Sequence, residues 1–288
     1  MLERICIGTA QFGMNYGISN SGGQTPKKEV FKILDFAQKN QITWLDTAEN
    51  YGNSQSILGE YLKYNPGCFR VQSKISSGVL DLKENINRTL NELQIDYLDS
   101  YLFHSYDQFK ANQKSIRDKV LNLKKVGICK ALGISIYHND EGTDEELLNF
   151  ADEVQLPFNV LDNYVRRGKL IQTLKGNNIK IQTRSIFLQG LILMSNDSVP
   201  KHLIGAKEVV AQLEKIGLKH GISRSQLAVA YAFSYSFANK IIMGVETLDQ
   251  FEENLMFIKH LKDLSKDFIH DIESLQIAEI KLLDPSKW

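Results

Sequence analysis

The stretch Ile42-Thr43-Trp44-Leu45-Asp46 is a short run of strand type that ends in a carboxylate. Before it lies a helical window, Pro26–Asn40, with apolar residues at helical spacing, Thr25 as the expected N-cap and Pro26 at the first position. A second helical window, Ser54–Tyr64, follows it. A strand with a helix on each side is typical of parallel sheets, because parallel neighbours need a long crossover connection.

The same alternation runs through the rest of the chain. The expected strands are Arg4–Thr9, Thr43–Thr47, Arg70–Lys74, Tyr97–His104, Lys130–Ser135, Glu153–Leu156, Lys180–Ser185 and Lys240–Val245. The further expected helices are Asp81–Leu93, Gln113–Val126, Asp144–Ala151, Arg167–Lys175, Ile204–His220, Ser223–Phe237 and Leu248–Lys259. Eight strand–helix pairs in 288 residues predict an α/β fold, a single (β/α)8 TIM barrel domain over residues 1–288. The alternative is an open doubly wound sheet, but the turn Gly8-Thr9-Ala10-Gln11-Phe12-Gly13 after the first strand lacks the GxGxxG fingerprint of that fold.

Two long loops are expected at the C-terminal mouth of the barrel. One is the glycine-rich segment Gln11–Gln24, and the other is the Ser-, Asn- and Asp-containing segment Gly190–Ile204. A last amphipathic stretch, Leu264–Glu279, predicts a C-terminal helix after residue 264, and the sequence leaves open whether it packs on the barrel or covers the mouth. The basic pair Arg166-Arg167 is expected to be a solvated helix start.

The composition excludes several function classes. Lys+Arg and Asp+Glu both number 34, so the formal net charge of zero gives no electrostatic case for binding nucleic acid or an anionic membrane. No stretch is long and apolar enough to span a bilayer, and the first residues enter a strand pattern rather than a signal peptide. The three cysteines, Cys6, Cys68 and Cys129, lack metal-ligand spacing and are expected to be reduced thiols in a cytoplasmic protein without a metal site.

Four residues stand where a barrel would gather them. Asp46, Lys74 and His104 each end a strand-type run, and Tyr51 lies in the loop just after Asp46. If these runs are consecutive strands, all four side chains meet at the C-terminal mouth, where residues of this fold are catalytic. Each alone has an ordinary structural explanation, but the ordered set favours a proton-donating site.

The chemistry of such a set is carbonyl protonation. A free tyrosine has a pKa of about 10, and a neighbouring ammonium, here Lys74, is expected to lower the pKa of Tyr51. Asp46 would hold Lys74 charged and oriented, and His104 would hydrogen-bond a substrate oxygen and direct it toward Tyr51. Because no protein side chain delivers hydride, reduction of the carbonyl carbon would need a nicotinamide cofactor.

The segment Asp46-Thr47-Ala48-Glu49-Asn50-Tyr51-Gly52, followed by Lys74 and His104 after the next two strands, resembles the catalytic pattern of the aldo-keto reductases. The likeness extends over nearly the whole chain and implies a (β/α)8 barrel that reduces aldehydes or ketones with NAD(P)H. By this resemblance Tyr51 is the general acid, Lys74 and Asp46 tune it, and His104 orients the carbonyl. The other motifs that carry the resemblance are Gly8-Thr9-Ala10-Gln11-Phe12-Gly13, Gly133-Ile134-Ser135, Gln155, Ile242-Met243-Gly244 and Glu253-Asn254.

The resemblance also implies a cofactor site. Its expected residues are Gly8, Thr9, Ser135, Gln155, Arg184, Gly244, Thr247, Gln250, Glu253 and Asn254. NADPH is the cofactor that the family favours, with NADH as the alternative, because Gly244 and Gln250 replace the Lys and Arg that commonly bind the 2′-phosphate. Thr247 would cap its helix and donate to a phosphate. Ile136 follows Ser135 where the family often has Asn, and Arg184 replaces a stacking Tyr, where it could stack on the nicotinamide or bind phosphate.

The substrate is a small-molecule carbonyl compound by the same resemblance. The mouth-loop aromatics Tyr16, Tyr106, Tyr137 and Phe187 are expected either to line its pocket or simply to pack. The segments Phe12–Gly17 and Arg184–Gly190 resemble a subgroup of small bacterial reductases associated with surface polysaccharides, which suggests a keto sugar. Many relatives are monomers, so a monomer or weak homo-oligomer is expected.

Two readings from other classes remain open. The first is a non-catalytic subunit that senses nicotinamide nucleotides, which the complete catalytic set disfavours. The second is a (β/α)8 lyase that forms a Schiff base on Lys74, which a carboxylate partner would make a poor nucleophile.

Overall fold

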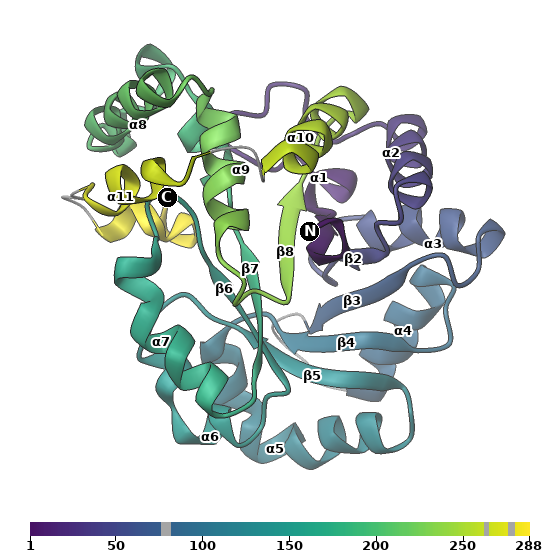
Figure 1. The fold of residues 1–288 in the computed structure, drawn as a ribbon. Helices are drawn as coiled ribbons and strands as arrows, with labels where there is room; N and C mark the ends of the chain where they lie inside the picture. Colours follow the sequence, from purple (N-terminus) through teal and green to yellow (C-terminus); the bar gives the residue numbers. More distant parts are fainter. Residues whose placement is uncertain (76–81, 262–264, 276–279) are drawn as a thin grey trace.

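Eight parallel strands close into a barrel in the order of the chain, which confirms the (β/α)8 prediction (Figure 1). The computed structural model describes residues 1–75, 82–261, 265–275 and 280–288. The strands are β1 (Ile5–Gly8), β2 (Trp44–Asp46), β3 (Arg70–Ile75), β4 (Leu98–Phe103), β5 (Cys129–Ser135), β6 (Glu153–Pro157), β7 (Lys180–Arg184) and β8 (Lys240–Gly244). Each lies within one residue of its expected bounds at both ends, because a buried parallel strand is marked by a local run of apolar residues.

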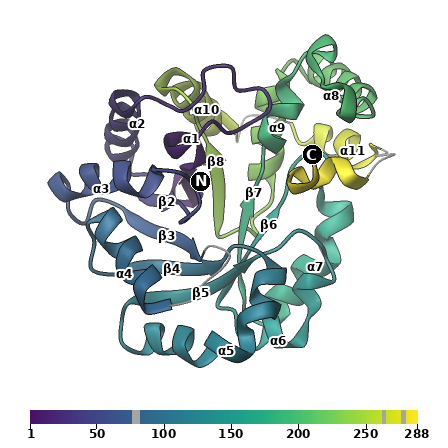
Figure 2. The same cartoon turned by 180° about the vertical axis from the view of Figure 1, so that it is seen from behind.

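The helices surround the barrel (Figures 1 and 2). They are α1 (Ala10–Gly13), α2 (Lys27–Lys39), α3 (Ser54–Tyr64), α4 (Leu82–Leu93), α5 (Tyr106–Lys125), α6 (Glu145–Leu148), α7 (Tyr164–Gly176), α8 (Ala206–His220), α9 (Arg224–Ser234), α10 (Leu248–His260) and α11 (Asp267–Glu273). Short 3-10 turns, among them η3 (Leu188–Leu193), η4 (Asn196–Ser198) and η5 (Lys201–Leu203), occupy much of the second mouth loop. Asp81, Leu264 and residues 276–279, which belong to two expected helices, lie outside the described residues.

Three expectations about helix starts are wrong. Helix α5 begins seven residues before Gln113, because the Ser105 hydroxyl caps it by accepting from the Gln108 N–H. Helix α2 has Pro26 at its N-cap position, and Thr25 instead donates its hydroxyl to the Glu246 carbonyl at 3.1 Å. Helix α7 begins at Tyr164, so Arg167 is not a solvated helix start.

Arg167 is buried, and its guanidinium pairs with Asp162 at 2.6 Å. It also donates to the Tyr137 carbonyl and the Asn139 side chain, so it fixes the loop after β5 against α7. A buried arginine needs such partners, because an unpaired charge in the interior is costly. The sequence of this basic pair does not show that the partners are present.

The two mouth loops contact each other. The Ile18 N–H donates to the Gln189 carbonyl at 2.9 Å, which joins the loop after β1 to the loop after β7. Gly190, at a φ of 89°, lies so close to this loop that an added Cβ would be 1.7 Å from the Ser19 hydroxyl. The short helix α1 covers the start of the first loop, where no helix was expected.

The barrel interior is polar along its axis. Gln72 of β3 donates to Asp46 of β2 and, at 2.8 Å, to Gln182 of β7. Since β3 and β7 are not neighbours, the second bond crosses the interior. Toward the N-terminal ends of the strands, Lys240 contacts Glu153 at 3.1 Å and Gln72 at 3.4 Å. Such barrels are usually filled by branched apolar residues, whereas here a hydrogen-bonded column runs from the mouth into the core.

The C-terminal segment packs on the outside of the barrel, beside α8 and α9 in both views (Figures 1 and 2). Asp271 of α11 pairs with His220 at 2.6 Å and Lys219 at 2.7 Å. Glu273 accepts from the Tyr231 hydroxyl at 3.0 Å. Within the described residues nothing after Asn254 lines the main cavity. This answers the question that the sequence left open, for the part of the segment that the structure describes.

The three cysteines are free, and Cys6 and Cys129 are buried in strands. Among the described helices none has the length and apolar character needed to cross a membrane.

Candidate active site

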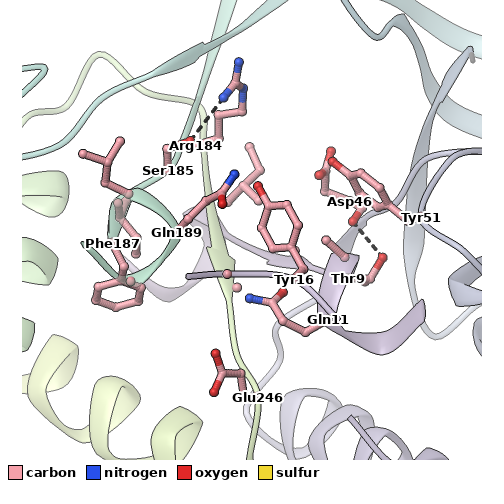
Figure 3. Close-up of a pocket in the computed structure, with 18 of the residues that line it drawn as sticks. Thr9, Gln11, Tyr16, Asp46, Tyr51, Arg184, Ser185, Phe187, Gln189 and Glu246 are labelled. Atoms are coloured by element: carbon pink, nitrogen blue, oxygen red, sulfur yellow. Dashed lines mark hydrogen bonds between the residues drawn. The ribbon is translucent and has the colours of Figure 1, made fainter. Parts of the chain in front are cut away.

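A cavity of about 490 Å³ opens at the C-terminal mouth of the barrel (Figure 3). The strand ends contribute Gly8, Asp46, Ser135, Arg184 and Gly244, and both mouth loops contribute further side chains. This size is ordinary for a small-molecule site. The barrel thus brings residues from distant parts of the chain to one opening, as expected of this fold.

Asp46 and Lys74 form a buried ion pair behind the cavity. The Lys74 ammonium contacts both carboxylate oxygens at 2.7 Å and the Thr47 carbonyl at 3.0 Å, and the lysine is 1% exposed. Oδ1 of Asp46 also accepts from the amides of Gln72 and Gln155. Asp46 lines the cavity but Lys74 does not. Such a charge pair is held by many donors, so its geometry is well defined.

Tyr51 lies between this pair and His104. Its hydroxyl is 3.4 Å from the Lys74 ammonium, and its ring meets the His104 ring edge-on, with centroids 5.6 Å apart. Burial, aided by the Asp46 carboxylate, raises the pKa of Tyr51 well above its usual range, while Arg184 acts in the opposite direction. The expectation of a lowered pKa is therefore wrong, because burial and the Asp46 carboxylate together outweigh the Lys74 ammonium. Tyr51 is a protonated phenol at neutral pH.

His104 is a neutral imidazole at the edge of the cavity. Burial, with the positive charges of Lys74 and Arg184, lowers its pKa to about 3. Its backbone N–H donates to the Gln108 side chain at 3.1 Å, and its Nδ1 is buried without a protein partner among the described residues. A neutral ring has one N–H donor and one acceptor nitrogen, so it can hydrogen-bond a substrate oxygen without bringing a charge.

Gln155 lines the cavity and has an unused acceptor. Its amide nitrogen donates to Asp46 at 3.0 Å and Gln182 at 3.1 Å, and its Oε1 is buried without a partner in the part of the chain that the structure describes. Ser135 is paired with Gln155 in the β5–β6 register, and both line the cavity. A carboxamide supplies the N–H that an orphaned amide oxygen needs, so these residues fit the nicotinamide group that the family resemblance implies.

One end of the cavity is acidic. Gly244, Glu246, Gln250, Glu253 and Asn254 line it, and the backbone of Glu246 is fixed by a bond from its N–H to the Gln250 side chain. Figure 3 shows Glu246 and Arg184 at opposite ends of the view. Thr247 caps α10 as expected, accepting from the Gln250 N–H, but it does not line the cavity.

The aromatic candidates divide into two groups. Tyr16, Tyr137 and Phe187 line the cavity, whereas Tyr106 does not and donates its hydroxyl to Asp144 at 2.8 Å. Burial raises the pKa of Tyr16 to about 12, so its phenol is neutral. Tyr137 lies under the Arg184 guanidinium, whose central carbon is 4.2 Å from the ring centroid.

Several polar residues at the site were not recognised from the sequence. Gln11, Ser19, Asn50, Ser185 and Gln189 line the cavity, and Gln72 and Gln182 hold Asp46 and Gln155 from below. For Gln72 a signal existed: it precedes Lys74 by two residues, so both side chains lie on the same face of β3. For the loop residues no local pattern distinguishes lining from solvent-exposed side chains.

The sequence model of the Aldo/keto reductase family matches residues 4–277. The chain is 25% identical to "Aldo-keto reductase str7" of Strobilurus tenacellus, over 86% of this chain and 81% of that protein. It is 23% identical to "L-galactose dehydrogenase" of Arabidopsis thaliana, over 92% and 87% of the two chains. The solved holo form of aldo-keto reductase AKR11C1 from Bacillus halodurans has the same fold, with a TM-score of 0.76 and 19% identity over 96% of this chain and 93% of that one. The chain therefore belongs to the Aldo/keto reductase family and is an NAD(P)H-dependent oxidoreductase.

Proposed function

We propose that this protein reduces the aldehyde or ketone group of a sugar-like substrate to an alcohol, with Tyr51 as the proton donor. The observation that carries this proposal is the protonated Tyr51 phenol at the cavity wall, beside neutral His104 and backed by the Lys74–Asp46 pair. When bound, a reduced nicotinamide nucleotide supplies the hydride to the carbonyl carbon.

Each residue of the set has a distinct task in this proposal. His104 donates a hydrogen bond to the carbonyl oxygen and directs it toward the Tyr51 hydroxyl. Tyr51 gives its proton to that oxygen, and the Lys74 ammonium, 3.4 Å away, stabilises the phenolate that remains. Asp46 fixes the ammonium in that position.

The Tyr51→Phe variant tests the acid directly, because it removes only the hydroxyl. We expect turnover to fall by about 10²- to 10⁴-fold, with the dissociation constant of the nucleotide, measured by calorimetry, unchanged. Full turnover in this variant would refute the role of Tyr51.

A Schiff-base lyase is disfavoured by the position of Lys74. The lysine does not line the cavity and is bound on both carboxylate oxygens of Asp46, and such an ammonium is a poor nucleophile. Borohydride trapping of a substrate on Lys74 would support the lyase. An absence of turnover in the wild type, with nucleotide binding intact, would support a sensing subunit.

We also propose that the nucleotide is NADH, although the family resemblance taken alone favours NADPH. Ser135 and Gln155 would hold the carboxamide, and the acidic end of the cavity would hold the adenosine ribose. Glu246 and Glu253 line that end, and the one arginine among the described lining residues, Arg184, lies at the opposite end of the view in Figure 3. Carboxylates repel a 2′-phosphate but accept hydrogen bonds from a ribose 2′-hydroxyl, as in dinucleotide-binding sheets.

Calorimetric titration with NADH and NADPH measures this preference without turnover. We expect NADH to bind at least about tenfold more tightly, a difference of about 1.4 kcal/mol. Glu246→Arg is expected to reduce or reverse the preference for NADH over NADPH. Glu252→Arg, in the adjacent helix α10 but outside the cavity, is the control that makes the same change in net charge. Tighter binding of NADPH to the wild type would contradict the assignment.

The sugar-like substrate follows from the polar lining of the mouth. Hydroxyl and amide groups of Tyr16, Asn50, Ser185 and Gln189 line the cavity and can bond the hydroxyls of a sugar. L-galactose dehydrogenase, a relative by sequence, is named for a sugar substrate. A screen of keto and aldo sugars against simple alkyl aldehydes of equal carbon number tests this proposal; equal kcat/KM values for both groups would remove it.

A further inference from the structure

Arg184, at the end of β7, brings a positive charge into the cavity. Among the described residues that line it, Arg184 is the only lysine or arginine. The sequence offered two tasks for it, stacking on the nicotinamide or binding a phosphate. Its contacts in the structure distinguish between a flat stacking surface and a set of hydrogen-bond donors.

The guanidinium is held in place by neutral groups. It donates to the Ser185 hydroxyl at 3.1 Å and the Ile136 carbonyl at 3.2 Å, and the Tyr137 ring covers one of its faces at 4.2 Å. A guanidinium has five N–H donors; these two bonds use two of them, and the Tyr137 side chain is a further partner. The side chain is thereby oriented while part of its hydrogen-bonding edge is left for a ligand.

The charge of Arg184 is not neutralised by its surroundings. Within the part of the chain that the structure describes, no carboxylate forms an ion pair with it. Asp162, which feels its charge, is already paired with Arg167 at 2.6 Å.

The ionisable groups around the place where the carbonyl would bind are neutral or paired. Tyr16 and Tyr51 are phenols, His104 is a neutral imidazole, and Asp46 is bound by Lys74. The positive charge of Arg184 reaches Tyr51 and His104, since it acts to lower the pKa of both. A net positive charge therefore lies near the place where the carbonyl would bind.

We propose that Arg184 binds an oxoanion group of the substrate, so that the substrate is an anionic carbonyl compound, a sugar acid or a sugar phosphate. This inference rests on the proposed carbonyl reduction. Carboxylate and phosphate oxygens match the planar fork of a guanidinium and accept from two N–H groups at once. Stacking on the nicotinamide would instead leave those N–H groups without acceptors.

The test compares three aldoses that differ in charge: D-glucuronate, D-glucose 6-phosphate and D-glucose. We expect the wild type to show a kcat/KM for at least one anionic sugar about 10- to 100-fold above that for glucose, the range for charge-assisted hydrogen bonds. The sugar whose kcat/KM exceeds that of glucose shows whether the group bound by Arg184 is a carboxylate or a phosphate. Arg184→Met should abolish the gain, so that its kcat/KM values for the three sugars become equal within about twofold, with the NADH dissociation constant close to that of the wild type.

A binding measurement that needs no turnover accompanies the kinetics. Oxalate and inorganic phosphate are titrated by calorimetry into the protein–NADH complex of the wild type, Arg184→Met and Arg166→Met. Arg166 is the control, since it lies outside the cavity and its loss changes the net charge equally. We expect one of the anions to bind the wild type and the Arg166 variant, and neither to bind the Arg184 variant.

Each result has a defined meaning. If the wild type has equal kcat/KM values for the three sugars, and anion binding is unchanged in Arg184→Met, the proposal is overturned. The proposal would also be overturned if NADH affinity in Arg184→Met fell by the same factor as kcat/KM for all three sugars. That result would indicate that Arg184 contacts the nicotinamide. If no carbonyl is reduced at all, the proposed function fails, whereas loss of anion binding in the Arg184 variant would still support an oxoanion site.

Discussion

Removing Lys74 should destabilise the protein far more than removing an exposed lysine with similar contacts. Lys74→Met leaves Asp46, 3% exposed, as a buried carboxylate without its counter-ion. Breaking a buried pair in this way costs about 3–5 kcal/mol. The amides of Gln72 and Gln155 still donate to Oδ1 of Asp46. We therefore expect the free energy of unfolding to fall by the lower end of this range, about 3 kcal/mol, which corresponds to a decrease in Tm of about 6 °C for a chain of this size.

The double variant Asp46→Asn/Lys74→Met isolates the pair. The asparagine side chain has the same shape as that of Asp46 but carries no charge, so the double variant should lose less stability than the sum of the two single variants, by about 1–3 kcal/mol. The free energy of unfolding is measured by urea titration with both circular dichroism and fluorescence. The activity of the double variant should stay low, because the ammonium next to Tyr51 is gone.

The control is Lys124→Met. Lys124 contacts Asp152 at 2.5 and 2.7 Å, yet the two side chains are 42% and 36% exposed, so solvent screens the pair and its loss should cost at most about 1 kcal/mol. If Lys74→Met costs no more than Lys124→Met, or if the Asp46 and Lys74 effects are additive, the reasoning from burial is refuted.

Two further predictions concern His104 and the loop that carries Tyr51. The pKa of His104 is lowered to about 3, whereas a histidine in the unfolded chain is protonated near pH 6.5. Between these values the unfolded chain binds a proton that the native state does not bind, so the free energy of unfolding is highest above about pH 6.5 and decreases as the pH falls toward 3. The pH profile of kcat/KM should therefore lack an inflection near 6.5 that depends on His104, and the free energy of unfolding should fall more steeply below pH 6.5 in the wild type than in His104→Asn; an inflection that this variant abolishes would contradict the neutral imidazole. Gly13→Ala should cost about 1–3 kcal/mol and lower turnover, because its Cβ would lie 1.8 Å from the Tyr51 carbonyl and 2.4 Å from the Ser54 nitrogen. Gly22→Ala, whose Cβ would come no closer than 3.7 Å to the Asn20 side chain, is the control; equal urea midpoints for the two variants would show that the contact with Tyr51 is not tight.

The sequence determined the order and limits of the strands. A strand that is buried on both faces is marked by a short run of mostly apolar residues, and each of the eight runs could be recognised from its local sequence. Once the strands are parallel and consecutive, the residues at their carboxyl ends must share one mouth. For this reason Asp46, Tyr51, Lys74 and His104 could all be expected at the mouth. In the structure Asp46, Tyr51 and His104 line the cavity, and Lys74 lies directly behind them.

The sequence was less informative where helix limits depend on capping or distant partners. Helix α5 begins at Tyr106 because Ser105 caps it, and Phe109 in its first turn packs in the core against Phe103. Arg167 resembles an exposed basic residue, and its burial depends on Asp162, Asn139 and the Tyr137 carbonyl. These partners are brought to it by the loop after β5, which no periodicity describes.

The tertiary structure alone decided the electrostatics and the shape of the site. The pKa of Tyr51 is raised, not lowered, because burial and the Asp46 carboxylate outweigh the Lys74 ammonium. The bond between Gln72 and Gln182 and the contact between Ile18 and Gln189 join segments more than a hundred residues apart. Local sequence fixes local conformation through sterics and periodicity, whereas these contacts exist only after the barrel has closed, since closure sets which side chains face one another across it.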